Sequence, residues 1–514
     1  MFSTVTTGMV CGIHSFLVQV EVDTAQGLPS FQMVGYLGSE VKEAKERVSV
    51  ALKNAGVKLP PLRITVNLSP ADMRKEGTAF DLPIAVGILK SLGIIPADCT
   101  ENLLLIGEMG LSGEIKKVRG ILPIVRKAKE EGLKCCIVPK ENEEEAAVIS
   151  DILVVGSSHI TELLEVLRHK ENLQLKAAKG CGILSALAKE NDFEEDFSDI
   201  NGQEAVKRAV EVAAAGFHHL LFIGPPGAGK TMLAKRIPTI LPPLTEEESM
   251  EVSTIYSVAG MLDGKMPYIA KRPFLNPHHT ISMQALAGGG RIPKPGVISL
   301  AHRGVLFLDE LPEFPRAIID ILRQPLEEKQ IHIARNSGSF VYPADCMFVG
   351  AMNPCPCGNY PDLSKCSCTS FAVQRYLSHI SGPILDRIDI CVETPKLTYN
   401  ELIHSTGKKE TSADIRARVM AARELQKQRY RGTKIRFNSD LTAGEIRRYC
   451  ELGTKEQKWM ERIFEAMKLS ARAYHRILKV ARTIADLEGK EKISEMHLTE
   501  AVCYRSADNK YFRK

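Results

Sequence analysis

The sequence predicts an α/β protein in which a parallel sheet is preceded by an α+β domain and followed by a helical domain. Between Ile200 and Pro395, buried-strand runs alternate with helical patterns, which favours parallel strands joined by crossover helices. One of these strands, Leu220–Ile223, leads directly into a glycine-rich loop and then a helical stretch. After Pro395 the strand patterns disappear and charged helical patterns take their place.

The length of 514 residues exceeds what one hydrophobic core serves, so several folded units are expected. Changes of pattern divide the chain into residues 1–170, a linker at 171–199, residues 200–395 and residues 396–514. In the first unit, strands are expected at Phe16–Val22, Arg63–Leu68 and Lys134–Val138, and helices at Ser39–Ala55 and Ile121–Glu131. In the last unit, helical patterns cover Ala413–Tyr430 and Gln457–Leu487.

The composition, 44% hydrophobic and 25% charged, is typical of a globular protein. The formal net charge of +5 is too small to indicate nucleic-acid binding by itself. The apolar runs are too short to span a bilayer, and the first residues lack the pattern of a signal peptide. We therefore expect a cytoplasmic protein without membrane association, whose 13 cysteines are reduced thiols.

The loop after Leu220–Ile223 has the form of a Walker A phosphate-binding motif, because it joins a buried strand to a helix. Its residues are Gly224, Pro225, Pro226, Gly227, Ala228, Gly229, Lys230 and Thr231. The glycines allow successive backbone N–H groups to face phosphate oxygens at the positive end of the helix. We expect Lys230 to reach the β- and γ-phosphates of ATP and Thr231 to bind Mg²⁺.

Two further predicted strands end in polar residues that would complete such a site. Val305–Leu308 is followed by Asp309, expected to hold Mg²⁺, and by Glu310, placed to orient or deprotonate the attacking water. Met347–Met352 is followed by Asn353, whose amide would hold that water; alternatively, Asn353 begins a turn before proline. Because the carboxyl ends of parallel strands meet at one edge of a sheet, we expect these residues to converge.

The order of these motifs, followed by the LDRID sequence at Leu385–Asp389, resembles the AAA+ superfamily, in particular the branch of magnesium chelatase and replicative helicase subunits. The resemblance implies that Arg387 is an arginine finger for the neighbouring subunit's ATP site. A surface ion pair with an adjacent aspartate is the alternative. Arg472 aligns with the sensor 2 contact to the γ-phosphate, and Arg476 is its rival. A finger acting in trans implies a ring, and the resemblance implies a homo-hexamer.

Longer segments resemble the magnesium-chelatase-like ComM/YifB family. They are Arg272–Ser282, Gly288–Gly290, Gly296–Gly304, Asn353–Gly358 and Ser381–Asp389. The resemblance covers essentially the whole chain and implies a DNA helicase that promotes branch migration in recombination or natural transformation. Single-stranded or branched DNA and recombination proteins would be its partners. Two alternatives stay open: a magnesium-chelatase-type ATPase and a scaffold ATPase, each remodelling a protein partner.

Two segments are candidates for DNA contact. Gln330–Arg335 and Ser339–Tyr342 are alternating runs around Asn336–Gly338, a pattern typical of a β-hairpin. Related helicases place such a hairpin in the ring pore, where Arg335 would contact backbone phosphates. The basic segment Gly288–Lys294 is the second candidate, with a solvated surface loop as the alternative.

The amino-terminal unit resembles Lon-type proteases at Pro70–Ala85, Leu105–Ile115 and Val138–Asn142. A Ser–Lys dyad needs a hydroxyl beside an amine, but the serine position holds Ala79 and the lysine position falls near Ile124. The resemblance therefore implies a non-proteolytic Lon-like domain, used for assembly or DNA contact. A cryptic dyad of Thr78 and Lys127 is the alternative.

Four cysteines lie close together in the sequence: Cys355, Cys357, Cys366 and Cys368. Four thiolates satisfy the tetrahedral coordination of a Zn²⁺ ion. The C-x-C spacing is tighter than the usual C-x₂-C, so a loop with free thiols is an equal alternative. The sequence leaves the choice between these two open.

Overall fold

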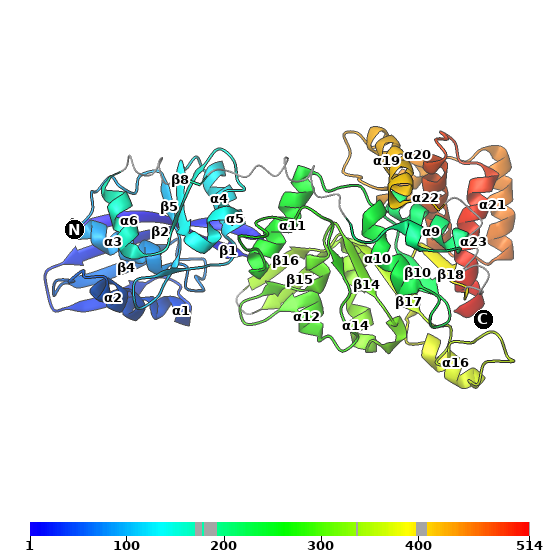
Figure 1. The fold of residues 1–514 in the computed structure, drawn as a ribbon, viewed down its shortest axis with the longest axis horizontal. Helices are drawn as coiled ribbons and strands as arrows, with labels where there is room; N and C mark the ends of the chain where they lie inside the picture. Colours follow the sequence, from blue (N-terminus) through cyan, green and yellow to red (C-terminus); the bar gives the residue numbers. More distant parts are fainter. Residues whose placement is uncertain (170–176, 179–192, 336–337, 397–408, 513–514) are drawn as a thin grey trace.

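The computed structural model describes residues 1–169, 177–178, 193–335, 338–396 and 409–512. Three units follow one another along the long axis of the molecule, from the blue amino-terminal unit to the red carboxyl-terminal helices (Figure 1). Most of the expected linker at 171–199 lies outside the described residues, as do Asn336 and Ser337 of the expected hairpin turn.

The amino-terminal unit is built on a seven-stranded mixed sheet in the order β3-β4-β2-β1-β5-β8-β9. Its strands are β1 (Phe2–Cys11), β2 (His14–Ala25), β3 (Ser30–Val34), β4 (Arg63–Ser69), β5 (Leu103–Leu105), β8 (Cys135–Pro139) and β9 (Leu153–Ser157). The pair β6 (Glu108–Met109) and β7 (Ile115–Lys116) forms a separate small hairpin. The alternating pattern of β2 buries Val18, Val20 and Val22 on one face of the sheet, as period-two alternation requires.

Among the described residues of this unit, six α-helices accompany the sheet. They are α1 (Ser39–Lys42), α2 (Ala44–Asn54), α3 (Asp81–Ser91), α4 (Ile121–Glu130), α5 (Glu143–Ala146) and α6 (Ile160–Arg168). The helical pattern at Ser39–Ala55 is therefore present but divided at Glu43. The mixed sheet with helices confirms the expected class of this unit.

The central unit contains a five-stranded parallel sheet in the order β11-β14-β17-β10-β18. Its strands are β10 (Leu220–Ile223), β11 (Phe274–Leu275), β14 (Val305–Leu308), β17 (Met347–Met352) and β18 (Ile390–Glu393). The strands β10, β14 and β17 are buried along their whole length, which explains their unbroken apolar runs. The expected parallel sheet is thus confirmed.

Helices and two small hairpins surround this sheet. The helices are α9 (Glu204–Gly216), α10 (Lys230–Ile240), α11 (Glu246–Ala259), α12 (Met283–Ala287), α13 (Val297–Leu300), α14 (Arg316–Ile321), α15 (Arg323–Glu328), α16 (Ser370–Leu377) and α17 (Gly382–Leu385). The hairpins are β12 (Gly288–Gly289) with β13 (Lys294–Pro295), and β15 (Gln330–Arg335) with β16 (Gly338–Pro343). The second hairpin pairs the two strands that the alternating sequence predicts.

The carboxyl-terminal unit is helical, with α19 (Ser412–Arg429), α20 (Ala443–Tyr449), α21 (Thr454–Ala466), α22 (Ala471–Leu487) and α23 (Glu495–Tyr511). The helical pattern at Gln457–Leu487 is present but divided between α21 and α22. Lys468 adopts a left-handed φ of 48°, and the Ser470 hydroxyl accepts a hydrogen bond from Ala473 N at 3.2 Å, so a new helix begins there. Within the described part of the chain, no helix combines the length and apolar character needed to cross a membrane.

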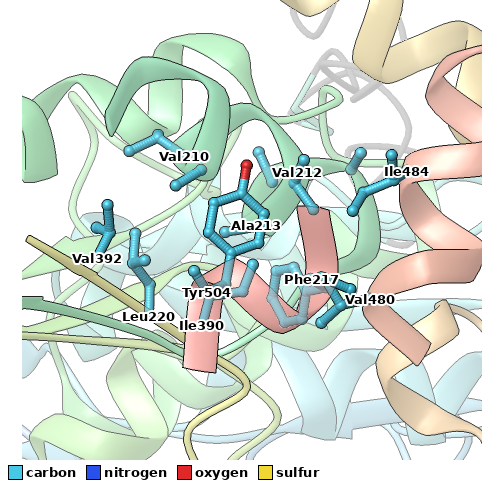
Figure 2. Close-up of a cluster of buried hydrophobic side chains, with 14 of the residues drawn as sticks. Val210, Val212, Ala213, Phe217, Leu220, Ile390, Val392, Val480, Ile484 and Tyr504 are labelled. Atoms are coloured by element: carbon cyan, nitrogen blue, oxygen red, sulfur yellow. The ribbon is translucent and has the colours of Figure 1, made fainter. Parts of the chain in front are cut away.

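One hydrophobic core joins the carboxyl-terminal helices to the central sheet. Figure 2 shows side chains of α9 (Val210, Val212, Ala213), of β10 and β18 (Leu220, Ile390, Val392), and of α22 and α23 (Val480, Ile484, Tyr504), together with Phe217. Because this core is continuous, the helical unit is attached to β18 and to β10, the strand that leads into the glycine-rich loop.

The amino-terminal unit contacts the central unit mainly through α4 and α11 (Figure 1). Gly120 N donates to Ser257 O at 3.0 Å, and Leu122 N donates to the Ser257 hydroxyl at 3.2 Å. Val252 and Tyr256 of α11 share a buried apolar cluster with Leu122. The contact is therefore both apolar and hydrogen-bonded.

Candidate nucleotide-binding site

The glycine-rich loop 224–229 connects β10 to the first turn of α10. Gly227 and Gly229 have left-handed φ values of 75° and 80°, which glycine adopts without steric cost. At Gly224, a Cβ atom would lie 2.2 Å from Thr394 O, so the end of β18 leaves no space for a side chain there. These positions let the backbone of the loop curve around an anion at the amino end of α10.

Lys230 points back into this loop. Its Nζ donates to Gly224 O at 2.7 Å, to Pro225 O at 2.9 Å and to Asn353 Oδ1 at 3.1 Å. Burial lowers the pKa of Lys230, while Asp309 and Glu310 favour its charged form. The ammonium group is thus held over the loop, where the β- and γ-phosphates of a nucleotide would bind.

Thr231 and Asp309 bring two oxygen atoms together beside the loop. The Thr231 hydroxyl donates to Asp309 Oδ2 at 2.6 Å, and Asp309 Oδ1 accepts from Glu310 N at 2.9 Å. A hydroxyl and a carboxylate are the hard oxygen donors that Mg²⁺ prefers, so these residues fit the ion. Glu310 is exposed and has a left-handed φ of 50°, which turns the chain sharply where β14 ends.

Asn353 lies beside Lys230 because β17, which it follows, lies between β10 and β14 in the sheet. Its amide oxygen accepts the hydrogen bond from Lys230, and its side chain is partly exposed. The structure thereby brings Lys230, Thr231, Asp309 and Asn353 to one edge of the sheet, with Glu310 adjacent. An exposed carboxylate next to an Mg²⁺-type site has the chemistry needed to activate water.

Arg387 and Arg472 are not joined to this group by any hydrogen bond or ion pair between described residues. Arg387 forms an ion pair with Glu327 of α15 and donates to Pro383 O at 2.7 Å. Arg472 is exposed in the first turn of α22. The rival residue Arg476 instead binds Asp389, with Nη1 and Oδ1 2.6 Å apart.

The network around Asp389 was missed at the sequence level. Asp389 Oδ2 lies 3.3 Å from His218 Nδ1, and His218 Nε2 lies 2.7 Å from the Thr483 hydroxyl. Although burial favours the neutral acid, Arg476 and His218 hold the pKa of Asp389 well below its usual range. The only sequence signal was an aspartate directly before a buried strand, which is common in proteins without such a network.

The four clustered cysteines also come together in space. Their sulfur atoms all lie within 4.8 Å of one another. The loop that carries them touches the glycine-rich loop, because a Cβ on Gly358 would lie 2.4 Å from Pro226 Cδ. No sequence pattern indicated the contact between Gly358 and Pro226.

The Lon-like positions face a cavity of about 1040 Å³ between the amino-terminal and central units. Ala79 and Ile124 both line it, and neither carries a hydroxyl or an amine. The Thr78 hydroxyl donates to Glu108, while Lys127 pairs with Glu131 at 2.7 Å. The structure therefore does not pair Thr78 with Lys127.

Three families described for magnesium chelatase match the chain. "Subunit ChlI of Mg-chelatase" matches residues 20–142, "Magnesium chelatase, subunit ChlI" residues 196–402, and "Magnesium chelatase, subunit ChlI C-terminal" residues 409–505. The matched segments together include most of all three units.

Curated relatives extend the similarity over nearly the full length. The chain is 42% identical over 497 residues to competence protein ComM of Haemophilus influenzae, covering 96% of each protein. It is 41% identical over 506 residues to the uncharacterized protein YifB of Escherichia coli, covering 98% of this chain and 97% of YifB. A segment of 141 residues, 25% of each protein, is 28% identical to Lon protease 2 of Bacillus subtilis. The chain therefore belongs to the magnesium-chelatase-like ComM/YifB family of AAA+ proteins and carries Lon-like similarity.

Proposed function

We propose that this protein is an ATP-hydrolysing ring motor that moves along DNA and promotes branch migration during recombination or natural transformation. Membership of the AAA+ family implies a nucleotide and Mg²⁺. The observation that carries the ATP-hydrolysing part of the proposal is the convergence of Lys230, Thr231, Asp309 and Asn353 at one sheet edge. In this proposal, Lys230 binds the β- and γ-phosphates, Thr231 and Asp309 hold Mg²⁺, and Glu310 activates the water that Asn353 positions.

In the proposed ring, the arginine finger of each ATP site comes from the neighbouring subunit. Arg387 is bound to Glu327 and to Pro383 O, and neither partner belongs to the glycine-rich loop. Because the Arg387 guanidinium does not bind the glycine-rich loop of its own chain, it is suited to contact the γ-phosphate bound by a neighbouring subunit. There it would stabilise the charge of the transition state. We propose a homo-hexamer, the state that the family resemblance implies, with Arg472 as a further γ-phosphate contact.

The two hairpins of the central unit are the proposed DNA-binding elements. Arg335 is exposed on β15, and its Nη2 lies 3.0 Å from the position of a Cβ on Gly289 in β12, so the hairpins adjoin. Arg291 and Lys294 belong to the segment that forms the hairpin of β12 and β13. Side chains of this kind bind backbone phosphates without reading sequence, as a translocating motor requires.

The test is ATP-dependent unwinding of a forked duplex by the full-length protein. Unwinding that Lys230→Ala abolishes, and ATPase activity that DNA stimulates less as salt rises, are the expected results. Arg335→Ala should weaken the stimulation of ATPase activity by DNA. It should also lower the slope of log DNA affinity against log salt concentration by about 1. Arg447→Ala, at an exposed site of α20, should have neither effect. Absence of both unwinding and DNA stimulation in an active ATPase would refute the motor proposal.

The second candidate is a magnesium-chelatase-type or scaffold ATPase that remodels a protein partner. The matches to magnesium chelatase subunits favour it. ATP hydrolysis that ignores DNA but rises with a co-purifying protein would support this candidate over the first.

A further inference from the structure

We propose that Cys355, Cys357, Cys366 and Cys368 bind one structural zinc ion that fastens the loop after β17 against the glycine-rich loop. This inference is independent of the DNA motor, because it concerns a metal site that ATP chemistry does not use.

The distances between the sulfur atoms match a shared ion. Cys355 Sγ lies 3.4 Å from Cys357 Sγ and 3.8 Å from Cys366 Sγ, and Cys357 Sγ lies 3.6 Å from Cys366 Sγ. With Zn–S bonds of about 2.3 Å, tetrahedral geometry separates the sulfur atoms by roughly 3.8 Å. The cluster therefore already has nearly the dimensions of a tetrahedral tetrathiolate site.

Hydrogen bonds to sulfur hold two of the ligands in place. Tyr360 N donates to Cys355 Sγ at 3.4 Å, and Asn359 Nδ2 donates to Cys357 Sγ at 3.9 Å. Contacts of this type orient thiolates and stabilise their charge in metal sites. A loop with unrelated free thiols has no need for them.

Apart from the cysteines, Gly358 and the partly buried Tyr360, the loop buries few side chains. Residues 361–365 are all exposed, and Leu363 is 82% exposed. Cys355 is fully buried, and the other three cysteines are partly buried around it. A segment that buries so little apolar surface needs a cross-link to stay ordered, and a bound metal supplies one.

The chemistry of the ligands selects the metal. Four soft thiolates within reach of one ion favour Zn²⁺ over Mg²⁺ or Ca²⁺, which prefer oxygen. With four protein ligands and no open position, the site is structural rather than catalytic.

The position of the cluster links it to the nucleotide site. Cys355 follows Asn353 by two residues, and Gly358, in the turn between the two cysteine pairs, lies against Pro226. Tyr360 also contacts Tyr511 of α23 edge-on, with ring centroids 6.2 Å apart. Zinc would thus brace the glycine-rich loop, the end of β17 and the last helix against one another.

The first experiment measures metal in the full-length protein. We expect about one equivalent of zinc per chain by mass spectrometry, and thiolate-to-metal absorption bands typical of a tetrahedral site after Co²⁺ replacement. The double variant Cys366→Ser/Cys368→Ser should lose the metal, whereas Cys503→Ser, at an exposed cysteine outside the cluster, should keep it. Wild-type protein with less than about half an equivalent of zinc, or with iron instead, would overturn the proposal.

A second measurement covers the case in which the double variant fails to fold. Titration of folded wild-type protein with a mercurial reagent should release zinc in step with the cluster thiols; reaction of those thiols without zinc release would count against the site.

A third variant tests the contact with the nucleotide site. Gly358→Ala places a Cβ against Pro226, whereas Gly432→Ala has the same φ of 79° and open space around it. We expect nucleotide affinity to fall several-fold more in the first variant than in the second. Equal affinities would remove the proposed brace.

Discussion

Arg476 of α22 forms an ion pair with Asp389, the residue directly before β18, with Nη1 and Oδ1 2.6 Å apart. Asp389 is only 6% exposed and stands two residues after Arg387. The helical unit is therefore anchored to the segment that carries the proposed arginine finger.

Replacing Arg476 should destabilise the fold, whereas replacing Arg472 should not. Arg476→Ala leaves a buried carboxylate without its cation, at a cost of about 3 kcal/mol. Arg472 is exposed, so Arg472→Ala should change stability by less than about 0.5 kcal/mol. Urea unfolding followed by circular dichroism measures both variants.

The same two variants separate their proposed roles in hydrolysis. If Arg472 contacts the γ-phosphate in the ring, a fully folded Arg472→Ala protein should lose most of its ATPase activity. Unchanged turnover in that variant would remove the sensor role from Arg472.

Glu310→Gln should bind ATP normally but hydrolyse it about 10² to 10⁴ times more slowly, because an amide cannot accept the proton of the attacking water. Steady-state ATPase assays and titration with a fluorescent nucleotide measure the two effects. Glu313, an exposed carboxylate three residues further on, provides the matched control Glu313→Gln. Rapid turnover by Glu310→Gln would assign water activation to another group.

Arg387→Ala should retain nucleotide binding and lose hydrolysis, since the finger stabilises only the transition state. Mixing it with Lys230→Ala should restore part of the activity. A mixed ring contains interfaces in which an intact loop faces an intact finger. Glu327→Ala removes the ion-pair partner of Arg387 but leaves the finger, and should stay active. No recovery in the mixture would argue against a site shared between subunits.

Stability should fall on acidification through the titration of His219. Burial lowers the pKa of His219 to about 4. The negative charge of Asp389 raises this pKa, whereas Arg476, Lys329 and His218 lower it further. In the unfolded chain, His219 binds a proton near pH 6.5. The contribution of His219 to the free energy of unfolding is therefore complete above that pH. The contribution, on the order of 2 to 3 kcal/mol, is lost as pH falls from about 6.5 to 4.

Urea unfolding at a series of pH values measures this dependence. His219→Gln keeps an acceptor for Phe348 N, which donates to His219 Nδ1 at 3.1 Å, but it does not titrate. The variant should show a flatter decline over the same pH range. Parallel curves for the two proteins would exclude His219 as the titrating group.

Much of the geometry of the candidate nucleotide-binding site was predictable from sequence because its parts are local. The strand Leu220–Ile223, the turn glycines and Lys230 are contiguous, so their order alone places the lysine at the start of a helix. Asp309 and Asn353 were predictable through a general rule, since parallel strands present their carboxyl ends at one edge. The same local reasoning failed at Lys468, where a left-handed residue interrupts an otherwise helical pattern.

The sequence by itself thus determined the fold class, the glycine-rich loop between a strand and a helix, and the strands that accompany it. Only the tertiary structure decided that Arg476 pairs with Asp389, that Gly358 lies against Pro226, and that four sulfur atoms lie within 4.8 Å of one another. The physical reason is distance along the chain. Hydrophobic periodicity and turn chemistry act over a few residues, whereas these contacts depend on how separate strands and helices pack around shared cores.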